Sequence, residues 1–250
     1  MKAAVVYKTD GIIEKVKDVL NQIGVSYTLF TQPTPDLEGY DFIVSIGGDG
    51  TILRILQKLR HCPPIFGINM GRVGLLTHSN PENFQERLKK AVEEFEIEIF
   101  PRLKCNVDGR EILALNEIAV VSKQPAKLIH VEIRVDDILA DRIRCDGIII
   151  STQIGSTGYA FSAGGPVVDP YLDCITIVPL APFRYGWKPF IVNIERKIEV
   201  EADNPLVIAD GQTSAEPKDT VRVEKSEFPA VFFKNDERFR ELFIKVKNIC

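Results

Sequence analysis

The strongest constraint on the fold is the stretch Asp41-Phe-Ile-Val-Ser-Ile-Gly-Gly-Asp-Gly-Thr51. A short apolar run at 42–46 leads into a turn with three glycines, and an apolar pattern with helical spacing begins at Ile52. A strand, a glycine-rich turn and a helix in this order place backbone N–H groups and a helix N-terminus against a phosphate. We therefore expect a strand–turn–helix unit that receives a phosphate-bearing ligand.

Asp49 is the unexpected residue of this turn. A carboxylate repels a phosphate unless it holds a metal ion or accepts a proton from an attacking hydroxyl group. The glycines around it lack a Cβ, so the backbone can adopt positive φ and a ligand can approach closely. The structural alternative is a tight turn in which Asp49 only caps the helix that begins near Thr51. The motif alone leaves both interpretations open.

Length and composition exclude several classes of protein. The chain has 250 residues, which is enough for two domains, and 45% of them are hydrophobic, as in ordinary globular proteins. The net charge of −4 gives no basic field for nucleic acid. No segment approaches the roughly 20 apolar residues that span a bilayer. We expect neither a nucleic-acid partner nor a membrane.

The five cysteines are scattered, odd in number and form no C-x-x-C pair. This pattern argues against a disulfide framework or a zinc site and predicts a location in the reducing cytoplasm. Cys145, between Arg144 and Asp146, is expected to be a small buried side chain rather than a reactive thiol.

The order of the patterns predicts two domains. Strand patterns alternate with helix patterns through residue 95, which indicates a doubly wound parallel sheet. From Glu96 onward strand-like runs follow each other, with hairpin turns expected at Asp108-Gly109 and Asp136-Asp137. We expect an α/β domain at 1–95, a β-rich domain at 96–233, and a C-terminal helix at 234–250 that packs back on the first domain.

A second glycine cluster extends from Asp146 to Pro166 and reads DGIIISTQIGSTGYAFSAGGP. An apolar strand leads into glycines that permit close backbone approach and into hydroxyl groups that can adjust their hydrogen bonds. Tyr159 offers a ring face to a flat base. A loop of this composition is also compatible with a purely structural role, in which Tyr159 only packs.

Three shorter motifs are each weak evidence of function when taken alone. In Asn116-Glu117, the adjacent amide and carboxylate can hold the vicinal hydroxyls of a ribose, or the pair can face water from an edge strand. Asp210-Gly-Gln212 is typical of a hairpin turn, and Pro179-Leu-Ala-Pro182 is an extended segment in which a small residue could admit a ring.

Together these motifs resemble the NAD kinase family. The matching stretches occur in the family's order over nearly the whole chain: GGDGT at 47–51, NE at 116–117, GSTGYAFSAGGP at 155–166, PLAP at 179–182 and DGQ at 210–212. The first stretch is shared with lipid kinases of the diacylglycerol and sphingosine type, so it indicates only a superfamily. The second cluster and the Asn-Glu pair single out NAD kinases.

The resemblance implies an N-terminal α/β domain with a parallel sheet, a β-rich C-terminal domain, and a site in the crevice between them. It also implies transfer of a phosphoryl group from ATP, another nucleoside triphosphate or polyphosphate to the 2′-hydroxyl of the adenosine ribose of NAD, giving NADP. A divalent metal ion such as Mg²⁺ would assist. A homodimer or homotetramer is expected, in which a neighbouring subunit completes parts of the site.

The resemblance also implies roles for individual residues. Asp49 would accept the proton of the attacking hydroxyl, and Gly50 would supply backbone contacts beside it. Residues 157–162 would surround the adenine and ribose of NAD, and Asp146 and Ala181 would lie at its nicotinamide end. All of the positions implied to contact NAD are Asn116, Glu117, Arg144, Asp146, Thr157, Gly158, Tyr159, Ala160, Phe161, Ser162, Ala181 and Gln212. Arg54 and Lys127 match contact positions outside the tight motifs, where a solvated surface role is an equal alternative.

Two other functions remain open from the sequence. A lipid kinase with the same central motif should show an apolar pocket or a basic amphipathic helix that faces a membrane, and no such helix is evident. A catalytically silent sensor would bind NAD and form no NADP.

Overall fold

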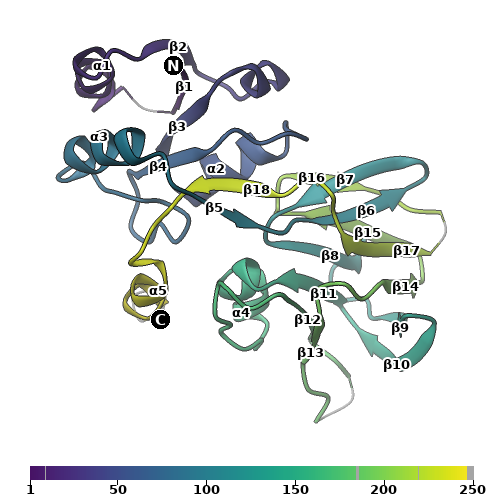
Figure 1. Ribbon diagram of the computed structural model, residues 1–250. Helices are drawn as coiled ribbons and strands as arrows, with labels where there is room; N and C mark the ends of the chain where they lie inside the picture. The colour runs from purple at the N-terminus through teal and green to yellow at the C-terminus, as the bar shows by residue number, and fades with distance from the viewer. Residues whose placement is uncertain (9, 184–185, 219, 247–250) are drawn as a thin grey trace. The chain divides into compact units, whose positions relative to one another are not determined.

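The computed structural model describes residues 1–8, 10–183, 186–218 and 220–246 (Figure 1). The chain divides into two compact units. Unit 1 is Met1–Phe100 together with the described part of Phe228–Cys250, and unit 2 is Pro101–Glu227.

Unit 1 contains a six-stranded sheet in the order β2-β1-β3-β4-β18-β5. Its strands are β1 (Lys2–Tyr7), β2 (Ser26–Phe30), β3 (Phe42–Gly47), β4 (Ile65–Asn69), β5 (Ile97–Phe100) and β18 (Ala230–Phe233). The pairs β1–β2, β1–β3, β3–β4 and β4–β18 are parallel, and only β5 runs antiparallel, beside β18. The parallel sheet expected from the alternating pattern is confirmed.

The helices of unit 1 are α1 (Ile13–Gln22), α2 (Asp49–Leu56), α3 (Phe84–Glu94) and α5 (Arg238–Val246), with a 3₁₀ turn η1 (Pro35–Gly39). Of these, α1 and α3 pack on one face of the sheet and α2 packs on the other. Val16 of α1 and Leu88 of α3 share one buried cluster with Val44 of β3. On the other face, a Cβ on Gly67 of β4 would lie 2.9 Å from Ile52 Cδ1 of α2, so this glycine lets α2 approach the sheet.

The unit boundaries differ from those expected. The sequence placed 96–233 in the β-rich domain, whereas β5 and β18 belong to the sheet of unit 1. A run of strand-forming residues predicts a strand but does not indicate which sheet the strand joins. The points near Pro101 and Phe228 where the chain passes from one sheet to another therefore cannot be predicted from the sequence pattern. The helix expected at 234–250 is described from Arg238 to Val246, within unit 1. The last four residues of that expected helix, 247–250, lie outside the described part.

Unit 2 is built from two six-stranded sheets, ordered β10-β9-β14-β17-β6-β7 and β13-β12-β11-β8-β15-β16. Every strand pair in them is antiparallel, as expected. The strands are β6 (Leu103–Val107), β7 (Arg110–Ala114), β8 (Glu117–Ser122), β9 (Ile129–Val135), β10 (Ile138–Cys145), β11 (Gly147–Thr152), β12 (Cys174–Leu180), β13 (Phe190–Asn193), β14 (Ile198–Ala202), β15 (Pro205–Ala209), β16 (Thr213–Ala215) and β17 (Val221–Lys225).

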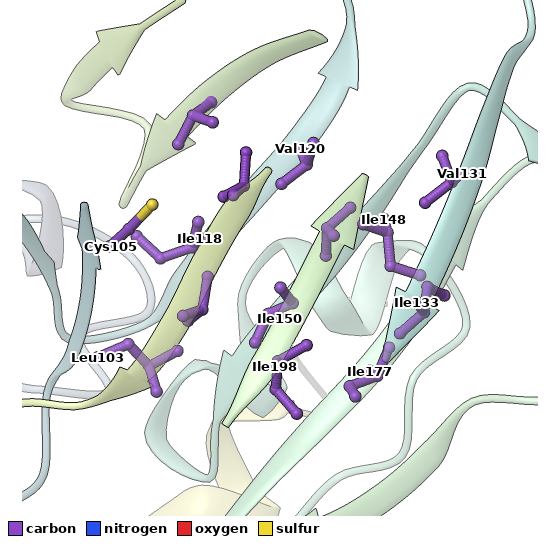
Figure 2. Close-up of a cluster of buried hydrophobic side chains, with 14 of the residues drawn as sticks. Leu103, Cys105, Ile118, Val120, Val131, Ile133, Ile148, Ile150, Ile177 and Ile198 are labelled. Carbon is purple, nitrogen blue, oxygen red and sulfur yellow. The ribbon is translucent and has the colours of Figure 1, made fainter. Parts of the chain in front are cut away.

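The two sheets of unit 2 share one apolar core. Figure 2 shows Val131, Ile133 and Ile198 of the first sheet in one buried cluster with Ile118 and Ile150 of the second. The alternation of apolar residues along each strand supplies these inward-facing side chains.

Both expected hairpin turns are present. Asp108 and Gly109 join β6 to β7 with φ of 49° and 82°, and Asp136 and Asp137 join β9 to β10 with φ of 48° and 66°. Positive φ at both central residues is what a type I′ turn requires.

A short helical segment covers the outer face of the second sheet of unit 2. It comprises η2 (Ile154–Thr157) and α4 (Tyr159–Ser162). Ala160 packs there in a buried cluster with Ala119, Ile149 and Val178. This apolar contact fixes the glycine-rich stretch against the sheet. Within the described ranges, no helix combines the length and apolarity needed to cross a membrane.

Candidate active site

In unit 1, Asp49 is the first residue of α2, directly after β3. Its Oδ2 accepts a hydrogen bond from the N–H of Leu75 at 2.8 Å, and its Oδ1 accepts one from the N–H of Leu76 at 2.8 Å. Gly48 is the N-cap residue of α2, and no side chain caps the helix. The capping alternative is therefore not what the structure shows: two amides of a following loop orient the carboxylate.

The glycines of this turn allow other atoms to approach the backbone closely, and none of them adopts positive φ. Gly47, Gly48 and Gly50 are all absent from the positive-φ residues of the described chain, and Gly48 has φ −101°. A Cβ on Gly47 would lie 2.2 Å from Thr51 Oγ1, whereas a Cβ on Gly50 would have no atom within 4 Å. Gly50 is exposed, so the backbone beside Asp49 is accessible from solvent.

Arg54 lies one helical turn after Gly50 and is also exposed. Its Nε donates to the carbonyl oxygen of Gly50 at 3.2 Å. The structure thus brings Asp49, Gly50 and Arg54 together at the start of α2.

In unit 2, Asp210 organises the Asn-Glu pair. It follows β15, is 4% exposed, and has φ 51°. Its Oδ1 accepts hydrogen bonds from the N–H groups of Asn116 (2.7 Å) and Glu117 (3.2 Å), and its Oδ2 accepts one from Leu115 N–H (2.9 Å). The sequence assigned Asp210 only to a turn and missed this role. The available signal was its position at the end of an apolar strand, in a motif shared with the family.

Asn116 and Glu117 each present a buried polar atom. Asn116 Oδ1 and Glu117 Oε2 have no hydrogen-bond partner among the residues that the structure describes. Such atoms are uncommon in native proteins because an unpaired buried polar group costs about 1–3 kcal/mol. The pair is not an edge-strand feature facing water, since Glu117 is 7% exposed.

The environment of Glu117 favours its neutral form. Burial, and then the nearby Asp210 carboxylate, raise its pKa to about 8, while the backbone N–H of Tyr159 acts in the opposite direction. Glu117 is therefore largely protonated at neutral pH, and its carboxyl group can donate as well as accept a hydrogen bond.

The loop after β11 packs directly on this pair. A Cβ on Gly155 would lie 2.2 Å from the backbone oxygen of Asn116, and a Cβ on Gly158 would lie 3.2 Å from Glu117 Oε2. Thr152 Oγ1 donates to the carbonyl of Leu115 at 2.6 Å. Only glycine at 155 permits this packing.

The other residues expected at 157–162 continue the same loop, in η2 and α4. Thr157 and Ala160 are buried, Phe161 is half-buried, Ser162 is exposed, and Tyr159 is 45% exposed. Gln212 donates from Nε2 to the carbonyl oxygen of Asp210 at 3.3 Å. We call this set the Asn-Glu group: Asn116, Glu117, Thr157, Gly158, Tyr159, Ala160, Phe161, Ser162, Asp210 and Gln212.

A second set of expected residues lies elsewhere in unit 2. The N–H of Asp146 donates to Leu180 O at 2.9 Å, just before Ala181, which has φ 42°. Phe183 N–H donates to Arg144 O at 2.8 Å, and the Arg144 guanidinium lies 5.4 Å from the centre of the Phe183 ring. We call Arg144, Asp146 and Ala181 the β10–β11 group.

Strand β11 separates the two groups. Ser151 pairs with Glu117, whereas Gly147 pairs with Leu180. Four residues of strand correspond to about 13 Å. Lys127, exposed in the turn before β9, lies toward the β10–β11 group, because the first residue of β9, Ile129, pairs with Cys145.

Cys145 itself is a structural residue, as expected. It is fully buried, and burial raises the pKa of its thiol to about 11. Over the described chain, no group of three or more His, Cys, Asp or Glu side chains could hold a metal ion.

Comparison with known proteins assigns the family. A model described as the ATP-NAD kinase N-terminal domain matches residues 7–96, and one described as the ATP-NAD kinase C-terminal domain matches residues 115–235. The chain is 64% identical over 249 residues to the NAD kinase of Archaeoglobus fulgidus, covering 100% of both proteins. It is 41% identical over 202 residues to the NAD kinase of Methanosarcina mazei, covering 78% of this chain and 70% of that one.

Solved structures agree with this assignment. An NAD kinase from Archaeoglobus fulgidus in complex with ATP superposes with a TM-score of 0.97 at 63% identity, with 100% of both chains covered. Yeast NADH kinase complexed with NADH has a TM-score of 0.84 at 18% identity, over 99% of this chain and 87% of that one, which shows the shared fold alone. With both of its family models matched and a full-length relative at this identity, the chain belongs to the ATP-NAD kinase family.

Proposed function

We propose that this protein transfers the γ-phosphoryl group of ATP to the 2′-hydroxyl of the adenosine ribose of NAD and so forms NADP. Family membership and the full-length likeness to an NAD kinase solved with ATP support this reaction. The observation that carries the mechanism is the Asp49 carboxylate at the start of α2, oriented by the amides of Leu75 and Leu76.

Asp49 is the proposed general base. As the ribose oxygen forms a bond to the γ-phosphorus, the bond from that phosphorus to the β–γ bridging oxygen breaks and ADP leaves. The proton of the hydroxyl passes to the carboxylate of Asp49. Phosphoryl transfer depends mainly on positioning and charge neutralisation, and general bases contribute about 10²–10⁴-fold. Gly50 leaves its backbone open for contacts beside this carboxylate, and Arg54 adds a positive charge one turn away.

The Asn-Glu group is the proposed binding site for the adenosine part of NAD. Asn116 Oδ1 and Glu117 Oε2 would gain the partners that the described residues do not give them, in the form of ribose hydroxyl or base-edge groups. The half-exposed Tyr159 ring can stack on the adenine. Thr157, Gly158, Ala160, Phe161, Ser162 and Gln212 shape the surroundings.

A divalent metal ion fits this site only as a companion of the triphosphate. No protein cluster of three or more acidic, histidine or cysteine ligands occurs in the described ranges. Mg²⁺ keeps several waters and is commonly bound through substrate phosphates, so the triphosphate and water would supply most of its ligands while Asp49 acts as the proton acceptor. When bound, the ion would neutralise the charge of the triphosphate.

We also propose a homodimer or homotetramer. The β10–β11 group lies at the opposite end of strand β11 from the Asn-Glu group. The family resemblance implies that a neighbouring subunit completes parts of the site, and Arg144, Asp146 and Ala181 would then contact the NAD of a neighbouring copy. A cytoplasmic location fits the free cysteines Cys105, Cys145 and Cys174.

The test is a screen of acceptors and donors with one purified sample. The protein is incubated with ATP, Mg²⁺ and NAD, and product is measured with an NADP-specific dehydrogenase; NADH, diacylglycerol and sphingosine replace NAD in parallel, and polyphosphate replaces ATP. We expect NADP from NAD and ATP. Phosphorylation of a lipid without NADP formation would favour the lipid kinase, and calorimetric NAD binding without NADP would favour the sensor.

A further inference from the structure

We infer that Arg238, the first residue of α5, is a positioning residue that holds Asp49 in place through a single peptide unit. The inference rests on the proposed role of Asp49 as the base. Arg238 lies 189 positions after Asp49 in the chain, and no motif of the sequence singled it out.

The connection runs through the peptide unit between Leu75 and Leu76. Its carbonyl oxygen, that of Leu75, accepts a hydrogen bond from Arg238 Nη1 at 3.1 Å. Its N–H, that of Leu76, donates to Asp49 Oδ1 at 2.8 Å. A cation on the carbonyl polarises the peptide and strengthens its N–H as a donor, because chained hydrogen bonds reinforce each other in a low dielectric. Arg238 therefore fixes the place of the donor and increases its strength.

Arg238 is itself held by several contacts. Its Nε donates to Glu98 Oε1 of β5 at 2.7 Å, and its Nη2 pairs with the same oxygen. The side chains of Arg238 and Glu98 are 5% and 8% exposed. The guanidinium also lies over the rings of Phe100 and Phe232, at 5.2 and 5.6 Å from their centres.

A purely structural role is the alternative, and energetics argue against it as a sufficient explanation. Replacing a buried ion pair by apolar residues of similar volume is often neutral or stabilising. Stability alone therefore gives little reason to bury Arg238 and Glu98. Their connection to the peptide that binds Asp49 supplies one.

The main test is the double variant Glu98→Met/Arg238→Met, which removes the guanidinium together with the buried carboxylate that it pairs with. We expect kcat for NADP formation to fall at least about tenfold, since small misplacements of catalytic groups have effects of this size. The KM values for NAD and ATP should change less than about threefold, because neither binding site is altered. Arg238→Lys provides a second route: its compact ammonium group cannot reproduce the guanidinium fork toward both Glu98 and Leu75, so an intermediate loss of kcat is expected.

A matched control is Arg87→Met. Arg87 Nη1 donates to the carbonyl oxygen of His78 at 2.5 Å and Nη2 pairs with Glu237, so this arginine holds the same loop but not the peptide unit that reaches Asp49. Its kcat should stay within about twofold of wild type. A loss equal to that of the Arg238 variants would overturn the inference, because general loop order would then explain both.

Coupling to Asp49→Asn decides whether Arg238 acts through Asp49. In that background the Glu98/Arg238 changes should cause no further loss of kcat, since the carboxylate they position is already gone. An undiminished further loss, or wild-type kcat in the folded Arg238 variants, would overturn the inference. If Asp49→Asn itself kept wild-type turnover, the proposed function of Asp49 would fail instead, so the two failures are distinct.

Discussion

Glu117 shows how one buried carboxyl group is adapted to its surroundings. Its neighbour Asp210 is committed to three backbone amides, and both acids are almost fully buried. Two adjacent buried carboxylates cannot both ionise easily, so one of them keeps its proton. Burial and Asp210 raise the pKa of Glu117 to about 8, which identifies it as that group.

Replacing Glu117 by Gln should stabilise the unliganded protein at alkaline pH. The pKa of Glu117 is about 8 when folded, against about 4.3 for an unfolded glutamate. Between these values the folded state keeps a proton that the unfolded state has lost, so the free energy of unfolding falls as pH rises through this window. Glu117→Gln removes this loss of unfolding free energy. The loss amounts to a few kcal/mol, because each unit of pKa difference corresponds to about 1.4 kcal/mol.

Thermal unfolding at pH 5 and pH 8 measures the difference. The variant's Tm should exceed that of wild type clearly at pH 8 and only slightly at pH 5. The control Glu82→Gln, at an exposed position, should show no such difference. Equal gains at both pH values would contradict the raised pKa.

In the turn from β3 into α2, Gly47 and Gly50 have different functions. Gly47 makes room for the Thr51 side chain, whereas Gly50 leaves open space where a ligand can approach. Gly47→Ala should lower the free energy of unfolding, because its Cβ would lie 2.2 Å from Thr51 Oγ1. Gly50→Ala has open space and should be neutral or stabilising by about 0.5–1 kcal/mol, since alanine is the better helix former. We expect kcat/KM to fall in Gly50→Ala all the same, because a methyl group would stand where the ligand approaches the backbone. Chemical denaturation and steady-state kinetics test this, and full activity in Gly50→Ala would show that no ligand approaches there.

Asp210 ties the end of β15 to the start of β8. Asp210→Asn keeps the shape but places an NH₂ group where N–H groups now donate, so at least one of the amides of Leu115, Asn116 and Glu117 loses its acceptor. We expect destabilisation by about 2 kcal/mol, as for other buried hydrogen bonds to charged groups, together with a higher KM for NAD. Calorimetric titration with NAD and thermal unfolding measure both effects. Unchanged NAD affinity would mean that Asp210 has no part in shaping the Asn-Glu group.

Much of this organisation was predictable from local pattern. The β3–α2 unit, the alternation in the first half and the hairpins at Asp108-Gly109 and Asp136-Asp137 follow from short-range propensity, which the sequence displays directly. The roles of Asp210 and Arg238 do not. Each depends on a partner far along the chain, at Leu115 and Leu75 respectively, and no local spacing encodes such a contact.

At the scale of the whole molecule, the chain leaves unit 1 after Phe100 and returns to it at Phe228. The returning segment supplies β18, which lies between β4 and β5 in the sheet, and α5, which carries Arg238. Unit 1 is therefore complete only when the last part of the chain is in place.

Truncation after Glu227 should consequently prevent unit 1 from folding. Removing an interior strand leaves β4 and β5 without their neighbour and exposes the faces that Phe232 and Phe233 bury. Unit 2 is continuous and loses nothing, so the truncated chain should keep its antiparallel β structure. Hydrogen exchange read by mass spectrometry should show loss of protection in residues 1–100 and retention in 101–227. Retained protection in both would contradict this division.

In the proposed reaction, the Asp49 carboxylate removes the proton of the NAD hydroxyl during phosphoryl transfer. The rate of NADP formation by Asp49→Asn at saturating ATP and NAD tests this role, since the variant keeps the size of the side chain, removes the base and leaves one of the Leu75 and Leu76 amides without its acceptor. We expect a kcat about 10²–10⁴-fold below wild type, with calorimetric binding of both substrates retained. Turnover close to that of wild type would contradict it.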